Sequence, residues 1–113
     1  MNRSGIVFFN ENPCGKIAET DDGYSFEYDP KWLKNPSAQA ISHTLPLSSE
    51  VYNSKTLFSF FDGLIPEGWL LDIAVKNWKL NPRDRMGLLL ATCQDCIGAV
   101  SVKSVMEGAM NDL

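Results

Sequence analysis

The sequence predicts an α+β domain in which a small, mostly antiparallel sheet of about five strands carries about three helices on one side. Three observations support this fold class. Turn signals separate short β-rich runs in the N-terminal third, apolar residues recur at helical spacing in the middle, and an alternating run near the C-terminus supplies a closing strand. At 113 residues the chain is expected to form one domain with a single modest core.

The N-terminal third is expected to form an antiparallel meander. Residues 5–10 (GIVFFN) and 16–19 are short β-rich runs, and the Asn-Pro-Cys-Gly sequence between them at 12–15 predicts a turn. The Asp-Asp-Gly sequence at 21–23 predicts a second turn. Aromatic and polar residues then alternate over 24–29 (YSFEYD), which is typical of a half-buried strand.

The next stretch is expected to contain a short helical turn and a further strand. Residues 30–33 open with a proline and predict the turn, and residues 40–47 (AISHTLPL) predict the strand. Pro46 would place the end of that strand at a sheet edge. Residues 48–55 are polar and predict a loop. His43 lies within the predicted strand without a partner for nucleophilic catalysis, so it is interpreted as a structural or surface residue.

Residues 57–78 organise the rest of the chain, because they predict two apolar helices that meet at a Pro-Glu-Gly elbow at 66–68. The positions at helical spacing are Leu57, Phe60, Phe61 and Leu64 before the elbow and Leu71, Ala74, Val75 and Trp78 after it. Most of them are interpreted as core. Trp69 falls off the second apolar face and is a candidate contact residue, with packing inside its own domain as the alternative. Glu67 and Asp72 suit the positive end of that helix.

A third helix and a closing strand are expected to complete the domain. Residues 81–84 (NPRD) form a helix start with Asn81 as the expected cap and a proline next to it. The apolar face of this helix is Met86, Leu89, Leu90 and Cys93. Residues 99–105 (AVSVKSV) alternate and predict the strand. The domain is therefore expected to span residues 1–105, followed by a flexible tail at 106–113.

Composition and charge argue against several classes of function. The net charge of −4 and the pI near 4.8, with scattered basic residues, argue against direct nucleic-acid binding. No apolar run approaches the roughly 20 residues of a membrane span, and the N-terminus does not have the pattern of a signal peptide. The odd count of three cysteines favours a reducing compartment over a disulfide framework, so a cytoplasmic location is expected.

The sequence predicts no catalytic residue, no cofactor and no metal site. Cys93 and Cys96 have CxxC spacing, but they fall at the C-terminal end of a predicted helix, where the dipole disfavours a thiolate. A zinc site would need two further ligands, and only Cys14 and His43 remain. Structural cysteines are the favoured interpretation, with a redox or metal-binding protein as the alternative. The sequence contains no phosphate-binding glycine loop, which leaves protein binding as the expected role.

Four motifs, in the same order, resemble the N-terminal domain of HipA-type Ser/Thr kinase toxins. Residues 60–68 (FFDGLIPEG) resemble the FFDNLLPEG signature of that family, and residues 23–30 resemble its FxYDP strand end. Residues 40–47 are similar to its AISLSLPL strand, and residues 88–102 (LLLATCQDCIGAVSV) to its LLxxIGRDCAGAV segment. The resemblance covers about residues 5–105. Within the last motif Cys-Gln replaces Gly-Arg, so a basic residue of the family pattern is missing.

The resemblance implies a fold and a partner rather than an activity. It ends where the kinase core of the family would begin, so no ATP-binding or catalytic residue is carried over. It also implies a split arrangement, in which a small HipS-like protein neutralises a separately encoded kinase, HipT, beside a DNA-binding HipB. The expected role is an antitoxin of a toxin–antitoxin system. The alternatives are an activating or structural subunit of the same kinase complex and an indirect part in operator binding through the DNA-binding partner.

The surface that binds the kinase is expected at the elbow. Trp69 would be the inserted anchor, with Phe61 and Leu64 at its base. Glu67 and Asp72 would face basic residues near the nucleotide site of the kinase. Aromatic anchors of this kind dominate the energy of protein–protein interfaces, which makes Trp69 the residue to test first.

Overall fold

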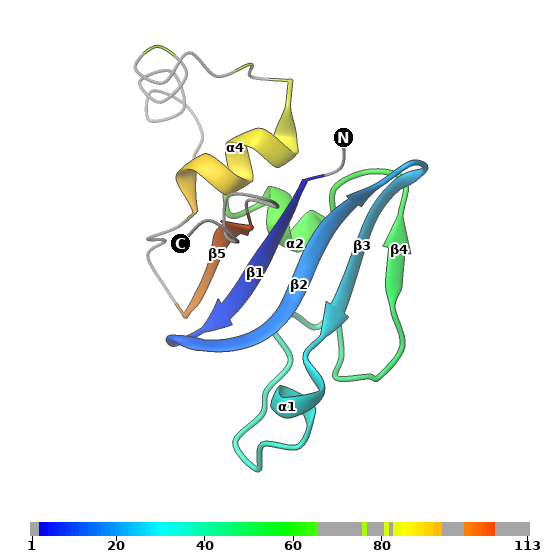
Figure 1. The fold of residues 1–113 in the computed structure, drawn as a ribbon, viewed down its shortest axis with the longest axis vertical. Helices are drawn as coiled ribbons and strands as arrows, with labels where there is room; N and C mark the ends of the chain where they lie inside the picture. Colours follow the sequence, from blue (N-terminus) through cyan, green and yellow to red (C-terminus); the bar gives the residue numbers. More distant parts are fainter. Residues whose placement is uncertain (1–2, 66–75, 77–80, 82, 94–98, 106–113) are drawn as a thin grey trace, which may run out of the picture.

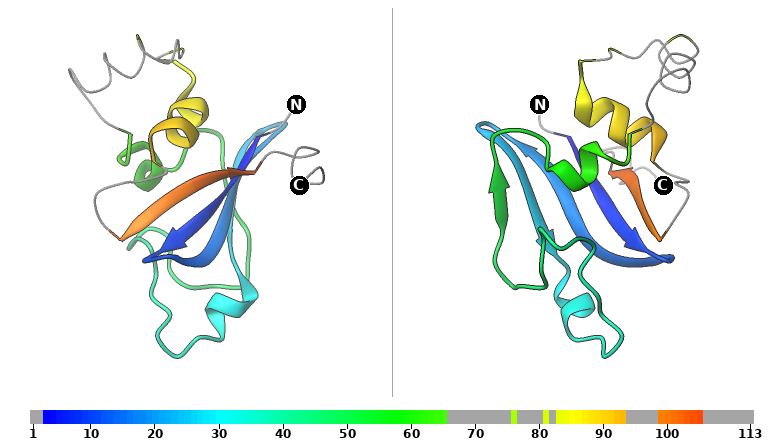
Figure 2. Two further views of the ribbon diagram at one scale, coloured as in Figure 1. Left: turned by 60° about the vertical axis from the view of Figure 1, so that its left-hand side comes forward. Right: turned by 180° about the vertical axis from the view of Figure 1, so that it is seen from behind.

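The computed structural model describes residues 3–65, 76, 81, 83–93 and 99–105, which form a five-stranded antiparallel sheet with the strand order β4-β3-β2-β1-β5 (Figure 1). The strands are β1 (Ser4–Phe9), β2 (Asn12–Thr20), β3 (Gly23–Tyr28), β4 (Tyr52–Ser54) and β5 (Val100–Val105). The described helices are α1 (Pro30–Leu33), α2 (Ser59–Asp62) and α4 (Arg85–Thr92). Helices α2 and α4 lie over one face of the sheet, and α1 follows the end of β3 (Figure 2). The predicted α+β class is confirmed.

The core lies between the sheet and helices α2 and α4. Alternation along β3 turns Phe26 and Tyr28 into it, at 0% and 3% exposure, and leaves Glu27 exposed on the other face, as predicted. Phe61 from α2 meets Phe26 at a ring distance of 5.5 Å. The predicted apolar face of α4 is also buried, and it comprises Met86, Leu89, Leu90 and Cys93. The elements far apart in sequence therefore share one apolar cluster.

The first turn lies earlier in the chain than predicted. The chain reverses at Asn10 and Glu11, which have positive φ angles of 53° and 86°, and the predicted turn at 12–15 belongs to β2. The register with β1 shifts at this point, and Cys14 is the extra residue of a β-bulge. A bulge near the start of a strand accommodates Pro13, which has no N–H to donate. The second turn, at Asp-Asp before Gly23, is as predicted.

The predicted strand at 40–47 and loop at 48–55 are both wrong. Residues 40–47 form a loop with one isolated bridge between Ser42 and Leu45, whereas Tyr52–Ser54 within the predicted loop form the edge strand β4. His43 consequently lies in an exposed turn rather than in a strand. The composition of the segment misled the prediction, because side chains elsewhere in the fold bind its backbone groups and replace a strand partner.

Three aromatic side chains hold this loop. The Tyr28 hydroxyl donates to the carbonyl of Leu45 and accepts from the N–H of Ile41 at 3.1 Å. Trp32 Nε1 donates to the carbonyl of residue 39 at 3.1 Å, and the Tyr52 hydroxyl donates to the carbonyl of residue 46 at 2.7 Å. Buried backbone groups need such partners, so these bonds fix the path of the loop over the end of the sheet.

The helices around the predicted elbow are shorter or capped differently from the expectation. Helix α2 comprises Ser59–Asp62, where the spacing predicted a helix from 57 to 64. Asp84, not Asn81, is the N-cap of α4, because its carboxylate accepts from the N–H of Gly87 at 3.1 Å. The second elbow helix lies outside the described residues except for residue 76, which is helical and exposed. No helix within the described ranges is long and apolar enough to cross a membrane.

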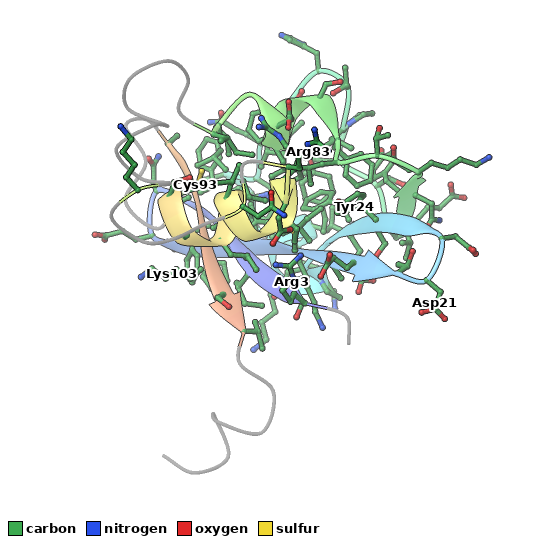
Figure 3. All side chains as sticks on the ribbon, turned by 90° about the horizontal axis from the view of Figure 1, so that it is seen from above. Arg3, Asp21, Tyr24, Arg83, Cys93 and Lys103 are labelled. Atoms are coloured by element: carbon green, nitrogen blue, oxygen red, sulfur yellow. The ribbon has the colours of Figure 1, made fainter. Side chains whose placement is uncertain are left out.

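Arg3 joins the sheet to the start of α4 (Figure 3). Its guanidinium donates to both carboxylate oxygens of Glu19 on β2, at 2.7 and 2.9 Å, and to both oxygens of Asp84, at 2.7 and 2.8 Å. These hydrogen bonds are the main cause that holds the pKa values of Glu19 and Asp84 below their ordinary values. A planar guanidinium fits two carboxylates in this way and a lysine ammonium does not.

Lowering the pH is therefore expected to destabilise the domain through this network. Because Glu19 and Asp84 have depressed pKa values in the folded state, their stabilising contribution is complete above the pKa values of the unfolded chain, about 4. This contribution is lost as the pH falls through the lower pKa values that the two carboxyl groups have in the folded state. The effect is measured as the midpoint of unfolding in guanidinium chloride at pH 7, 4 and 3. In Arg3→Ala the acid-dependent loss should be smaller, and Arg3→Lys, which keeps the charge without the fork, should fall between. An unchanged pH profile in Arg3→Ala would contradict the assignment.

Candidate protein-binding surface

The residues that lead into the predicted elbow are held against α4. Asp62 at the end of α2 forms an ion pair with Arg85, with 2.6 Å between the carboxylate oxygen and Nε. The thiol of Cys93 donates to the carbonyl of Leu64 at 3.3 Å. The ion pair is half-exposed, so it contributes orientation more than stability. Together the two contacts fix the chain up to Ile65, which is 2% exposed and anchors the entry to the following segment.

The structure separates the predicted contact residues into three groups. Phe61 is 0% exposed and belongs to the core of the domain, so it supports the surface from beneath and does not present its own side chain. Leu64 is half-buried and packs against that core. Glu67, Trp69 and Asp72 lie outside the described residues, and their role as partner contacts stays a prediction.

The cysteines within the described ranges have the environment of structural residues. Cys14 and Cys93 are both 0% exposed. Burial, together with the nearby carboxylate of Asp29, raises the pKa of the Cys14 thiol to about 12. A thiol with so high a pKa is a poor nucleophile at neutral pH. Cys96, the second half of the CxxC pair, lies outside the described residues. In the described part, no group of three or more His, Cys, Asp or Glu side chains is arranged to hold a metal ion.

A thiol titration of the native protein checks this arrangement. We expect Cys14 and Cys93 to react with Ellman's reagent only after unfolding in guanidinium, because water and reagent cannot reach them in the folded state. The Cys96→Ser variant should then show no fast phase. A fast phase in that variant would contradict the structural interpretation and would favour the redox alternative.

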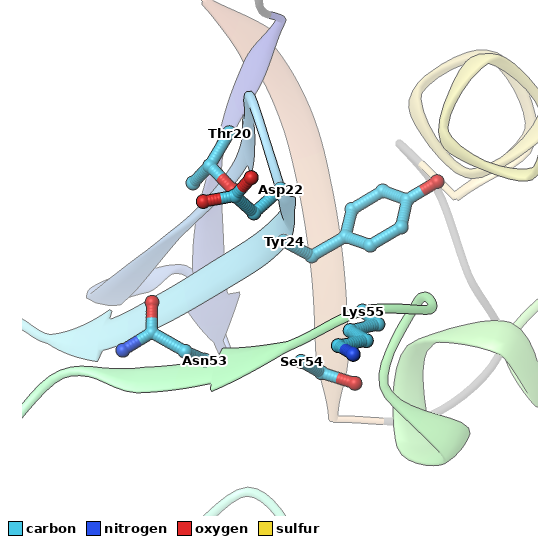
Figure 4. A pocket seen from close by; sticks show the side chains of 6 residues that line it. All are labelled: Thr20, Asp22, Tyr24, Asn53, Ser54 and Lys55. Carbon is cyan, nitrogen blue, oxygen red and sulfur yellow. The ribbon is translucent and has the colours of Figure 1, made fainter.

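Two of the hollows formed by the described residues contain polar side chains without a catalytic arrangement. One of about 420 Å³ lies at the β2–β3 turn and β4, and its lining residues are Thr20, Asp22, Tyr24, Asn53, Ser54 and Lys55 (Figure 4). These side chains contain no nucleophile with an adjacent base. Tyr24 and Asn53 point to opposite sides of the sheet in the same view, so this hollow wraps around the sheet edge. A larger one, of about 700 Å³, lies on the sheet face opposite α2 and α4.

The sequence did not predict that the loop at 39–51 would expose two large apolar side chains. Leu47 and Val51 are 40% and 49% exposed, and they are the large hydrophobic residues exposed in the described part of the chain. The loop that carries them is fixed by the bonds from Tyr28, Trp32 and Tyr52. Only the aromatic residues themselves could have signalled this, because their hydroxyl and indole groups need hydrogen-bond partners when buried.

Comparison with known proteins gives consistent matches over nearly the whole chain. The family model of the HipA N-terminal domain matches residues 5–103. An uncharacterized protein of Haemophilus influenzae is 31% identical over 101 residues, which cover 89% of this chain and 92% of the relative. The solved N-terminal domain of HipA toxin has a TM-score of 0.70 and 27% identity, covering 93% of this chain and 94% of that domain.

A larger solved assembly contains the same fold. It is the toxin–antitoxin complex of HipA, HipB and operator DNA from Shewanella oneidensis MR-1, where the match has a TM-score of 0.68 and 21% identity. It covers 92% of this chain and 24% of the matched chain. At this identity the similarity establishes the fold alone.

Proposed function

The chain belongs to the HipA N-terminal domain family, and from this membership we propose that it is a toxin–antitoxin component that binds and neutralises a separately encoded HipA-like kinase of the HipT type. The match is to the N-terminal domain and not to a kinase catalytic domain, which supports a role as a binding protein without enzymatic activity. The family match over residues 5–103 is the observation on which the proposal rests.

The proposed binding surface is the segment from Leu64 to Asp72, which contains the predicted elbow at 66–68. Trp69 inserts into the kinase, and Glu67 and Asp72 pair with basic residues beside its nucleotide site. The ion pair of Asp62 and the hydrogen bond to the Leu64 carbonyl support this proposal, because they hold the residues that precede the segment on a rigid core. A surface that is fixed before binding loses less entropy when the complex forms.

Separation of the domain from the kinase has an energetic consequence. A domain linked to its kinase meets it at a high effective concentration, and a separate chain does not. The free domain must therefore bind through surface contacts alone, for which a stable interface buries about 1,600 Å² in total. We propose that residues 1–105 supply this surface and that residues 106–113 are dispensable for it. The complex forms in the cytoplasm, where the kinase has access to ATP.

A HipB-like protein is the second proposed partner. The Shewanella oneidensis assembly of HipA, HipB and operator DNA contains the same fold within a chain four times longer, as the 24% coverage indicates. By analogy, this chain joins a ternary complex through the kinase. The net charge of −4 supports contact with the protein partners rather than with DNA itself.

The decisive experiment measures the activity of a HipA-like kinase that lacks this domain, from the same genome. We expect the purified chain to bind the kinase and to lower its autophosphorylation, and co-expression should restore growth of cells that produce the kinase. Increased autophosphorylation would instead indicate that the chain is an activating subunit of the kinase complex. Absence of binding to the kinase would overturn the proposal.

A further inference from the structure

The face of the sheet opposite α2 and α4 carries an ordered row of charges. Strand pairing places Lys103 of β5 beside Ile6 of β1, Ile6 beside Lys16 of β2, and Lys16 beside Glu27 of β3. Their sequence neighbours Val7, Ile17, Phe26 and Val102 are buried in the core. Because successive side chains of a strand alternate, the row lies on the other face, which neither α2 nor α4 covers (Figure 2).

This face is apolar at its centre and hollowed. The hollow of about 700 Å³ is lined by Ile6, Phe8 and Pro13 together with Lys16, Glu27 and Pro30, among others. Ile6 and Phe8 are only half-buried, although both are large and apolar. Lys103 lies over the Phe8 ring, with Nζ 5.1 Å from its centroid. An apolar strip flanked by charges is the composition of a protein interface rather than of a solvated sheet face.

Lys16, Glu27 and Lys103 are exposed, and none of them forms an ion pair with another described residue. The ion pairs within the described ranges are formed by Arg3 and Arg85, and none involves Lys103, Lys16 or Glu27. Lys103 on β5 is at one end of the row and Glu27 on β3 is at the other, with Lys16 of β2 next to Glu27, so the two ends have opposite charges. A chain with a net charge of −4 generally repels its own copies, but this row can complement itself.

We propose that two copies of the chain pack face to face through this surface, related by a two-fold axis that runs parallel to the strands between β1 and β2. The strand order β5-β1-β2-β3 then places β5 of one protomer over β3 of its partner, and β1 over β2. Lys103 of each protomer faces Glu27 of the other. Ile6 lies against the aliphatic stem of Lys16, which covers apolar surface while its ammonium group reaches water.

The dimensions of the sheet predict a weak dimer. Four strands about 4.8 Å apart, each contributing about six residues at about 3.3 Å, give a footprint of about 400 Å². This is about half of the 800 Å² per partner in a stable interface, so the dimer dissociates on dilution. Helices α2 and α4 lie on the opposite face of the sheet, so the proposed dimer leaves both of them uncovered.

Sedimentation equilibrium of the full chain, from roughly 10 to 500 µM at low salt, tests the proposal. We expect concentration-dependent dimerisation of the wild type. Glu27→Lys places lysine opposite Lys103, and Lys103→Glu places glutamate opposite Glu27, so each single variant should raise the dissociation constant at least tenfold. The double reversal restores opposite charges between the protomers and should associate clearly more tightly than either single variant. It should not fully reach the wild type, because it also places a like charge beside Lys16 and removes the contact of Lys103 with the Phe8 ring.

Two control variants distinguish an effect of the charged row on dimerisation from an effect of the net charge of the chain. Glu50→Lys and Lys55→Glu make the same changes in charge at exposed positions outside the face, and they should leave the dissociation constant unchanged. A wild type that is monomeric throughout this range would overturn the proposal. So would a double reversal that associates as weakly as the single variants while its circular dichroism spectrum shows a folded domain, because Lys103 and Glu27 would then not face each other between protomers.

Discussion

Replacement of Phe61 with alanine is expected to lower the free energy of unfolding by about 3 to 5 kcal/mol. The side chain is 0% exposed, and its ring lies 5.5 Å from Phe26 and 5.2 Å from Phe60. Truncation would leave a cavity between β3 and α2, which the surrounding sheet cannot close. Thermal denaturation should show the midpoint falling by more than about 10 °C.

The neighbouring residue on the same helix provides the control for this measurement. Phe60 is half-buried at the margin of the core, so Phe60→Ala should cost only about 1 kcal/mol. Equal losses in the two variants would mean that α2 contributes to stability as a whole and not through the Phe61 side chain. An unchanged melting temperature in Phe61→Ala would place that ring at the surface.

The second large effect is expected at Trp69, where alanine should weaken binding of the kinase by about 2 kcal/mol or more, about 30-fold in Kd. The reason is its predicted position off the apolar face of its helix, where an aromatic side chain is available to a partner. The measurement is the affinity of the purified variant for a HipA-like kinase, together with protection in a growth assay. The melting temperature should stay within a few degrees of the wild type.

Val51 offers the matched control for loss of an apolar contact. It is 49% exposed and lies in the loop before β4, so Val51→Ala should change neither kinase binding nor stability. Full protection by Trp69→Ala at normal expression would remove Trp69 from the binding surface. A large fall in melting temperature would instead assign the indole to the core of the domain.

The sequence predicted those elements whose pattern is local. The alternation of YSFEYD placed β3 and its buried face correctly, because a strand turns every second side chain to the same side. The spacing of Met86, Leu89 and Leu90 likewise identified the buried face of α4. Phe61 was correctly assigned to the core, since a local apolar stripe indicates burial whether or not the exact helix limits are known.

The errors arose where the structure depends on contacts between distant residues. The segment 40–47 has the composition of a strand, yet Tyr28 and Trp32 bind its backbone from outside and fold it as a loop. Asp84, and not the predicted Asn81, is the N-cap of α4. Arg3, which is far away in the sequence, holds the Asp84 carboxylate at the start of the helix. The open charged row was missed for the same reason, since it exists only after four strands are paired.

The anchoring of the 39–46 loop by Tyr28 also has a consequence for the dynamics of the domain. The amide of Ile41 donates to a hydroxyl whose own ring is buried in the core, so this amide cannot open without disturbing β3. Hydrogen–deuterium exchange at Ile41 should therefore proceed at the slow rate of the β3 amides, although the residue belongs to neither a helix nor a strand. The loop and the central sheet would then unfold as one cooperative unit.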